Sequence, residues 1–138
     1  MFIDASAIVS ILTDEPDAAS LAEAIDRTSK PITSPITIFE AALGIKRKFD
    51  LTSERAELNV VRFLAAAGVE VVPVLTTDTA TALSAFRRYG KGSGHPAALN
   101  MGDCFAYAVA KNHGRVLLYT GDVFSQTDAD SRNDGESG

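Results

Sequence analysis

The sequence of 138 residues contains one cysteine, Cys104, and no tryptophan. A single cysteine excludes an intramolecular disulfide and any zinc site built on paired cysteines, and it favours a cytoplasmic location. No hydrophobic run approaches the roughly 20 residues that span a bilayer, so no membrane helix is expected. The first apolar residues are not preceded by a positively charged segment, so the N-terminus does not resemble a signal peptide.

An excess of positive charge is also missing, because the net charge is −5. A nucleic-acid-binding protein with a basic surface throughout is therefore excluded, whereas a local basic patch is not. Much of the negative charge lies at the end of the chain, in Asp128, Asp130, Asp134 and Glu136. This composition predicts one globular domain over residues 1–125 and a disordered acidic tail over residues 126–138.

Short apolar runs alternate with segments of helical periodicity along the domain. Strands are predicted at 2–4, 31–33, 69–74 and 116–119, and helices at 5–13, 18–25, 34–49, 53–67, 77–89 and 102–113. Strands that alternate with helices in this way pair in parallel and carry helices on both faces of the sheet. The predicted fold class is therefore α/β, with a functional crevice at the carboxyl ends of the strands.

Two aspartates follow predicted strands, Asp4 at the start of the chain and Asp122 near its end. The carboxyl ends of parallel strands meet at one edge of a sheet, so these side chains are expected to be neighbours. Each also has a simpler interpretation, because Asp4 can cap the next helix and Asp122 can occupy a turn.

Two more acids lie on predicted helices. Glu40 shares a helix face with Ile36 and Leu43, so it points inward with the apolar residues, unless it lies at the edge of that face. Asp103 lies in a first helical turn, where the helix dipole alone would favour it. Carboxylates gathered at one place raise one another's pKa unless a cation lies among them. Their oxygens suit Mg²⁺, or Mn²⁺ as a substitute, so the leading hypothesis is a metal site that acts on phosphate esters.

The sequence around these acids resembles one family. The relevant segments are Phe2-Ile3-Asp4-Ala5-Ser6-Ala7, Asn100-x-Gly102-Asp103-Cys104-x-Ala106-Tyr107-Ala108 and Leu118-Tyr119-Thr120-Gly121-Asp122, with Glu40 between the first two. Together they are similar to the PIN domain family, and within it to the VapC-type toxins of toxin–antitoxin pairs. The resemblance implies a three-layer α/β/α sandwich around a parallel sheet and a Mg²⁺-dependent endoribonuclease.

The same resemblance implies roles for individual residues. It makes Asp4, Glu40, Asp103 and Asp122 the catalytic acids, of which Asp4, Asp103 and Asp122 hold the metal. Ser6 and Thr120 correspond to supporting hydroxyls of the family. The implied partners are an RNA substrate (tRNA, rRNA or mRNA), a cognate VapB-type antitoxin and a second copy of the chain in a homodimer.

The chain departs from the family pattern at two places. Val123 follows the last acid where members often carry a second acid, and Ala129 replaces an isoleucine that is common near the C-terminus. We expect the first change to weaken metal binding at that position and the second to weaken docking of the C-terminal segment. Neither change touches the four acids.

Basic residues near the acids are candidates for RNA contacts. Arg87, Arg88 and Lys91 precede a loop that leads to Asp103, so they are predicted to line an RNA path, and the basic cluster at 46–48 is a second candidate. The simpler interpretation of both groups is a solvated helix end with charges that favour the dipole.

Two other functions are alternatives to the nuclease. A phosphatase of the haloacid-dehalogenase type also places acids at strand ends, but it requires a second aspartate where this chain has Ser6. A catalytically silent PIN-like module that binds RNA or protein is the remaining alternative. Such a module is expected to lack one of the four acids, and none is lost here.

Overall fold

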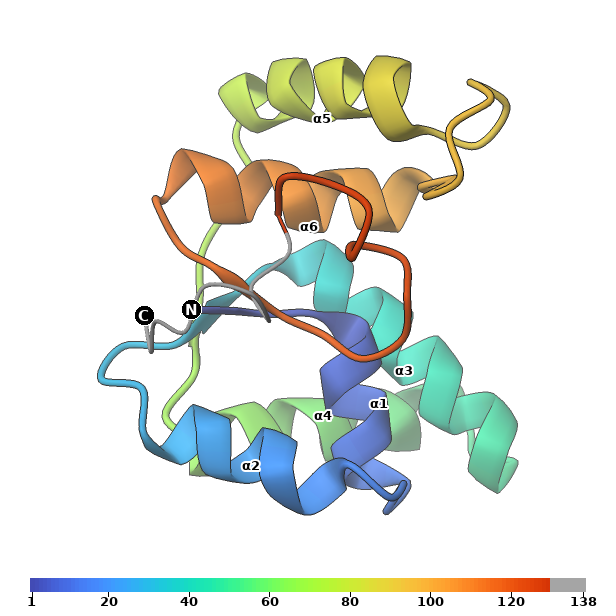
Figure 1. The fold of residues 1–138 in the computed structure, drawn as a ribbon. Helices are drawn as coiled ribbons and strands as arrows, with labels where there is room; N and C mark the ends of the chain where they lie inside the picture. Colours follow the sequence, from blue (N-terminus) through green and yellow to red (C-terminus); the bar gives the residue numbers. More distant parts are fainter. Residues whose placement is uncertain (130–138) are drawn as a thin grey trace.

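Four short parallel strands form the centre of the computed structural model, which describes residues 1–129 (Figure 1). The strands are β1 (Phe2–Ile3), β2 (Ile32–Thr33), β3 (Glu70–Val71) and β4 (Leu117–Leu118), and their order in the sheet is β3-β2-β1-β4. Phe2 is in register with Ile32 on one side and with Leu117 on the other. The first and last strands of the domain are therefore direct neighbours.

Six helices cover the two faces of this sheet (Figure 1). Their bounds are α1 Ala5–Leu12, α2 Ala18–Asp26, α3 Pro35–Phe49, α4 Ser53–Ala66, α5 Thr76–Tyr89 and α6 Met101–Asn112. Helices α5 and α6 lie on one face, and the first four helices lie on the other. The predicted three-layer α/β/α sandwich is thus confirmed. No helix within residues 1–129 is long and apolar enough to cross a membrane.

Each layer of helices closes its own hydrophobic core. Successive residues of a strand point to opposite faces, so Phe2 joins the core beneath α5 and α6, whereas Ile3 joins the core formed with α1 to α4. Both side chains are fully buried. The continuous apolar run at the start of the chain is therefore explained by a strand that is covered on both faces.

The observed strands are shorter than the sequence predicts, and β3 shows the reason. A strand was expected over residues 69–74, but the parallel pairing ends after Val72 donates its N–H to the carbonyl of Thr33 at 2.9 Å. Beyond that point β2 offers no partner, because Ser34 caps α3 and Pro35 opens it. Short strands leave their carboxyl ends close to the first turns of the following helices.

The end of the described chain is placed against the domain. The predicted disordered tail begins at Gln126, yet residues 126–129 are positioned, and Ala129 packs against the core under α5 and α6. The rest of the predicted tail, residues 130–138, lies outside the described residues.

Candidate active site

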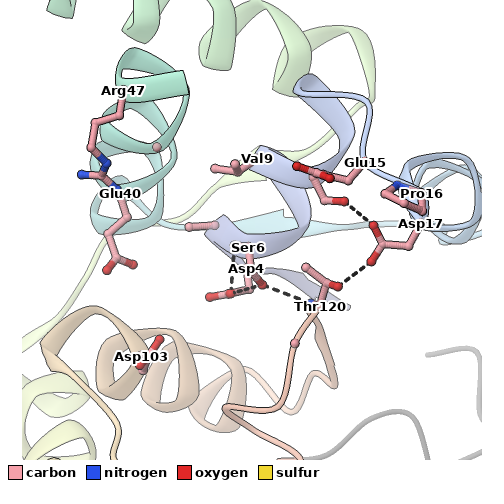
Figure 2. Close-up of a pocket in the computed structure, with 14 residues that line it drawn as sticks. Asp4, Ser6, Val9, Glu15, Pro16, Asp17, Glu40, Arg47, Asp103 and Thr120 are labelled. Carbon is pink, nitrogen blue, oxygen red and sulfur yellow. Dashed lines mark hydrogen bonds between the residues drawn. The ribbon is translucent and has the colours of Figure 1, made fainter. Parts of the chain in front are cut away.

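A cavity of about 830 Å³ opens where β1 and β4 end, between α1, α3 and α6 (Figure 2). Its charged lining residues are the acids Asp4, Glu15, Asp17, Glu40 and Asp103 and the base Arg47. Figure 2 shows Glu40 and Arg47 on α3, with Asp103 on α6 facing them across the cavity. Three of the four acids predicted from the sequence are thus brought to one place.

Local helix capping fixes two of these carboxylates. Asp4 is the N-cap of α1, and its Oδ2 accepts hydrogen bonds from the backbone N–H of Ser6 at 3.0 Å and from the Ser6 hydroxyl at 2.6 Å. Asp103 forms a capping box with Asn100 at the start of α6, through bonds of 3.0 and 2.8 Å. The simpler interpretation of Asp4, as a helix cap, is therefore correct, and Asp103 lies in a first helical turn as expected but also forms a capping box. Capping is also what orients both side chains toward the cavity.

Glu40 reaches the cavity from the middle of α3, whose start is set by the Ser34 cap and by Pro35. Burial, and then the nearby carboxylates of Asp4 and Asp103, raise the pKa of Glu40 from 4.5 to about 7. Burial also raises the pKa of Asp103 to about 6, against the lowering effect of its hydrogen bond with Asn100. The pKa of the buried Asp4 is raised mainly by burial. The three carboxylates therefore repel one another, and charge neutralisation here requires protons or a cation.

A chain of hydrogen bonds through Ser6 and Thr120 connects Asp4 with Asp17, the residue before α2. The Ser6 hydroxyl accepts the N–H of Thr120 at 3.1 Å, and the Thr120 hydroxyl donates to Asp17 at 2.5 Å. The Ser10 hydroxyl donates to the other oxygen of Asp17. Both bonds lower the pKa of Asp17, so this acid stays ionised while it holds the segment after β4 against α1.

Asp17 is a site residue that sequence reasoning missed. It precedes α2 in a polar loop, and no pattern along the chain connects it with Ser10 or with Thr120. Ser6 and Thr120 do lie where the family resemblance expects supporting hydroxyls, and both line the cavity.

Asp122 and the predicted RNA-contact residues lie elsewhere. Asp122 is exposed and is not part of the cavity lining, so the structure does not bring it together with the other three acids. Arg87, Arg88 and Lys91 are also exposed and absent from the lining. The basic side chain that does line the cavity is Arg47, from the cluster at 46–48.

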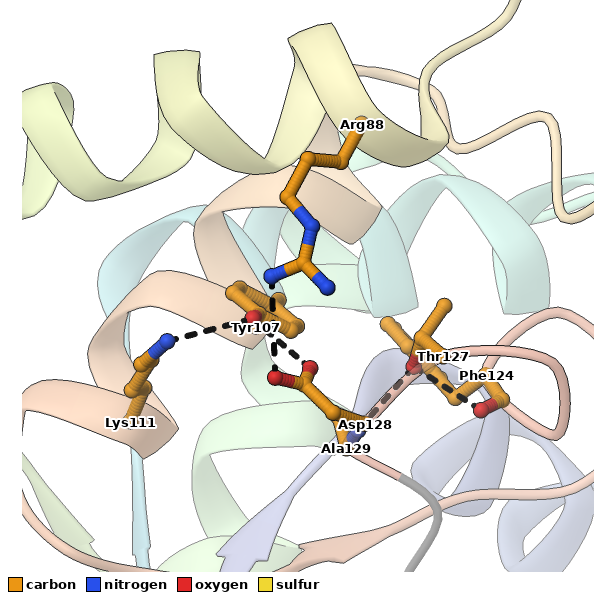
Figure 3. A network of polar contacts seen from close by, with 7 residues as sticks. All are labelled: Arg88, Tyr107, Lys111, Phe124, Thr127, Asp128 and Ala129. Carbon is orange, nitrogen blue, oxygen red and sulfur yellow. Dashed lines mark hydrogen bonds and ion pairs between the residues drawn. The ribbon is translucent and has the colours of Figure 1, made fainter. Parts of the chain in front are cut away.

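Arg88 instead takes part in a polar network that holds the C-terminal segment (Figure 3). Its guanidinium lies 3.8 Å from the Asp128 carboxylate, which also accepts a hydrogen bond of 2.7 Å from the Tyr107 hydroxyl. Lys111 donates to the same hydroxyl at 3.4 Å. These bonds place residues 126–129 against α6 without the isoleucine that the family commonly has nearby.

Comparison with known proteins identifies the family. A family model described as the PIN domain matches residues 1–130. The chain belongs to the PIN domain family. The resemblance seen in the sequence is thereby confirmed, and the Asp4, Glu40 and Asp103 carboxylates occupy the crevice of a PIN domain.

The relatives of this PIN domain are VapC proteins. It is 42% identical over 139 residues to a VapC ribonuclease of Rhizobium meliloti (strain 1021), covering 92% of this chain and 97% of that protein. It is 44% identical over 128 residues to a ribonuclease VapC of Mycolicibacterium smegmatis, covering 93% and 96%. The crystal structure of Mycobacterium tuberculosis VapC20, a toxin that cleaves the sarcin-ricin loop, has the same fold, with a TM-score of 0.70 at 16% identity and coverage of 90% and 92%.

The chemistry of the cavity fits a hard divalent cation. Its acids supply carboxylate oxygens, the ligands that Mg²⁺ and Mn²⁺ prefer. The pKa values of Glu40 and Asp103 are raised first by burial and then by neighbouring carboxylates, and no basic side chain is among the causes of either shift. Within residues 1–129, however, no three acidic, histidine or cysteine side chains are close enough to form a ready-made metal cluster. A cation would therefore have to draw the carboxylates closer together.

The raised pKa values predict how stability depends on pH in the metal-free protein. Glu40 and Asp103 have ordinary pKa values of 4.5 and 3.8 but titrate at about 7 and about 6 in the folded state. The folded state therefore binds more protons between these values, and the free energy of unfolding falls as pH rises from about 4 to about 7. We expect a loss of roughly 1–2 kcal/mol after solvent screening, measured as a lower thermal midpoint.

Glu40→Gln is the matched variant for this measurement, because glutamine keeps the shape and does not titrate. Its thermal midpoint should exceed that of the wild type near pH 8 and should depend less on pH. An unchanged pH profile in this variant would show that Glu40 is not the group responsible.

The network around Asp128 predicts a second effect on stability. Tyr107→Phe removes the hydroxyl that donates to Asp128 and leaves the buried ring in place. Because Asp128 is half exposed, we expect a loss of about 0.5–1 kcal/mol and a thermal midpoint lower by about 2–4 °C. In an Asp128→Ala background the same substitution should have little further effect. Equal effects in both backgrounds would contradict the assigned bond.

Proposed function

We propose that this PIN domain is a Mg²⁺-dependent endoribonuclease toxin of the VapC type. The observation that carries the proposal is the convergence of Asp4, Glu40 and Asp103 on one cavity, where burial and, for Glu40 and Asp103, neighbouring carboxylates raise their pKa values. The ribonuclease names of its relatives support the same reaction class. RNA of the tRNA, rRNA or mRNA class is the substrate we expect.

Asp4 and Asp103 are the residues best arranged to hold the metal. Each uses Oδ2 for its helix cap, so Oδ1 is left to bind a cation. When bound, Mg²⁺ would polarise the phosphate and lower the pKa of a nearby water molecule. Glu40, which reaches the same cavity from α3, is suited to accept a proton from that water. Asp122 was predicted as a further ligand, and we propose for it only an indirect role.

Helix α6 contributes to the binding of the phosphate as well. Asp103 lies in the first turn of this helix, where the helix dipole favours an anion. The Ser6 and Thr120 hydroxyls are engaged with Asp4 and Asp17. They therefore hold the geometry of the acids and of the segment after β4, and they do not act as nucleophiles.

Arg47 is the residue that we propose to bind an RNA phosphate. A phosphodiester is repelled by five acids in the cavity lining, and Arg47 is the only basic residue among the lining residues. The described side chains form no ion pair with it. A guanidinium binds phosphate oxygens in a fork, which also fixes the orientation of the backbone. This arrangement favours an RNA path over α3 instead of the predicted path past Arg87, Arg88 and Lys91.

A VapB-type antitoxin and a second copy of the chain are the protein partners that we propose, in the cytoplasm. Two apolar grooves support this, one of about 410 Å³ between α3 and α4 and one of about 370 Å³ between α5 and α6. Phe39 in the first groove is 65% exposed and Met101 in the second is 68% exposed. Apolar side chains exposed to this degree are typical of protein interfaces.

The alternative, a silent module that binds RNA or protein, keeps the same fold. The retained carboxylates argue against it, because a binding module gains nothing from three acids that destabilise one another.

The proposed reaction predicts that RNA cleavage requires both the metal and Asp103. Purified protein, freed of any partner, is incubated with tRNA, rRNA and an mRNA, with Mg²⁺ or Mn²⁺ and with a chelator. The wild type should cleave at least one RNA class only when the metal is present. Asp103→Asn should reduce the rate by about 100-fold or more while the fold is retained. Metal-dependent cleavage that survives this substitution would refute the site, and absence of metal binding would favour the silent module.

The proposed role of Arg47 predicts weaker RNA binding without loss of the metal. Arg47→Ala should raise KM about 5–10-fold and reduce the salt dependence of RNA binding by about one phosphate contact. Arg62→Ala is the matched control, since Arg62 is an exposed arginine of α4 away from the cavity lining. If Arg88→Ala weakens binding and Arg47→Ala does not, the RNA path follows α5 as the sequence predicted.

A further inference from the structure

Gly102 is a glycine whose backbone does not require glycine. It is the second residue of α6, is buried, and lies outside the set of residues with positive φ. At a helical position of this kind alanine is normally the more stable choice, because glycine loses more backbone entropy on folding. The reason for a glycine must therefore lie in the space around it.

The carboxylate of Glu40 occupies that space. A Cβ atom added at Gly102 would overlap Oε2, Cδ and Oε1 of Glu40, the three atoms of the carboxylate. The carboxylate thus rests directly on the backbone of the first turn of α6, beside Asp103, where the helix dipole offsets part of its charge.

No other glycine within residues 1–129 has such a neighbour. An added Cβ at Gly44 would meet the Val9 side chain at 2.7 Å, and one at Gly90 would meet the backbone and ring of Phe86. The remaining described glycines have open space at this position but positive φ angles. Only at Gly102 does an ionisable group fill the volume of the missing side chain.

We propose that Gly102 is a positioning residue. Because it has no side chain, it leaves a space against α6, the carboxylate seat, in which the Glu40 carboxylate lies. Any larger residue at 102 would push this carboxylate off α6 and away from Asp4 and Asp103. The glycine that precedes Asp103 therefore acts on the site through α3, a helix far from it in the sequence. Its importance for catalysis rests on the proposed function, whereas the seat itself rests on geometry alone.

A set of stability measurements tests the seat without any metal or substrate. Gly102→Ala is made in the wild type, in Glu40→Gln and in Glu40→Ala, and the thermal midpoint of each metal-free protein is measured. The substitution should lower the midpoint in Glu40→Gln, where an uncharged side chain of the same length must leave the space beside Gly102. In the wild type above about pH 7 the loss should be smaller, because displacement also relieves the repulsion on the Glu40 carboxylate. The substitution should raise the midpoint in Glu40→Ala, where the space is open and alanine is the better helix former. Equal effects in the three backgrounds would overturn the proposal.

Gly44→Ala is the matched control for these measurements. Gly44 lies in the same helix as Glu40, and its added Cβ would meet Val9 rather than a carboxylate. Its effect on the midpoint should be the same in Glu40→Gln as in Glu40→Ala. A change of sign here as well would mean that Glu40→Ala alters helix packing in general, and it would refute the specific role of Gly102.

Measurements of Mn²⁺ affinity then test whether the carboxylate seat affects the proposed metal site. Gly102→Ala should weaken Mn²⁺ binding by roughly 10–100-fold, the usual effect of disturbing a residue that orients ligands, and should lower kcat more than it raises KM for RNA. Gly102→Ala could leave the Mn²⁺ affinity unchanged and still lower the midpoint in Glu40→Gln and raise it in Glu40→Ala. That result would limit Gly102 to a structural role and overturn its role in positioning. If the wild type binds no Mn²⁺, the proposed function fails, while the sign change still decides whether the seat exists.

Discussion

Repulsion among three carboxylates is the constraint around which this end of the molecule is arranged. Asp4, Glu40 and Asp103 come from three separate helices, and each would be more stable in water than beside the other two. The raised pKa values of Glu40 and Asp103 express this cost. A fold that keeps such residues together must hold each of them by bonds that do not depend on the charge of its neighbours. Helix caps hold Asp4 and Asp103, a chain of hydroxyl groups supports Asp4, and the space beside Gly102 accommodates Glu40.

The parallel sheet explains why the acids meet at all. Strands β1 and β4 are adjacent and run in the same direction, so the residues that follow them, Asp4 and Thr120, lie at one edge. The Thr120 N–H donates to the Ser6 hydroxyl, which in turn donates to Asp4. These bonds hold the segments that follow β1 and β4 together next to the Asp4 carboxylate. Helices α3 and α6 then add Glu40 and Asp103 from either side of the sheet. The site is thus a property of the complete topology and not of any one segment.

Most of the architecture follows from patterns that are local in the sequence. Helical periodicity, the Ser34-Pro35 start signal and the continuous apolar run at Phe2 and Ile3 suffice to predict the layers and the parallel sheet. Glu40 does reach the cavity, but the reason given from the sequence was wrong. Leu43, with which it was expected to share a buried face, is exposed, and α3 buries Thr37, Ala41 and Ile45 instead. Strand ends were less predictable, because β3 stops where its partner β2 turns into a helix, which depends on pairing and not on the residues of β3.

The parts of the site that sequence reasoning missed all depend on contacts between distant segments. Asp17 accepts a hydrogen bond from Thr120, which lies 103 positions further along the chain. Gly102 in α6 lies against Glu40 in α3. Arg88 was predicted to face RNA, but it lies near Asp128, a residue that had been assigned to a disordered tail. Asp122 was placed with the other acids because it follows a strand, whereas the turn after Gly121 leaves it exposed. Spacing along the chain indicates which end of the sheet a residue reaches, but not which way its side chain points.

The position of β4 has a consequence for the time at which the site can form. The strand that lies against β1 is the last strand within residues 1–129, and it brings Thr120 to Ser6. Strand β1 is synthesised first, and its edge toward β4 stays unpaired until nearly the whole domain has been synthesised. The nascent chain therefore lacks a finished cavity until translation is almost complete.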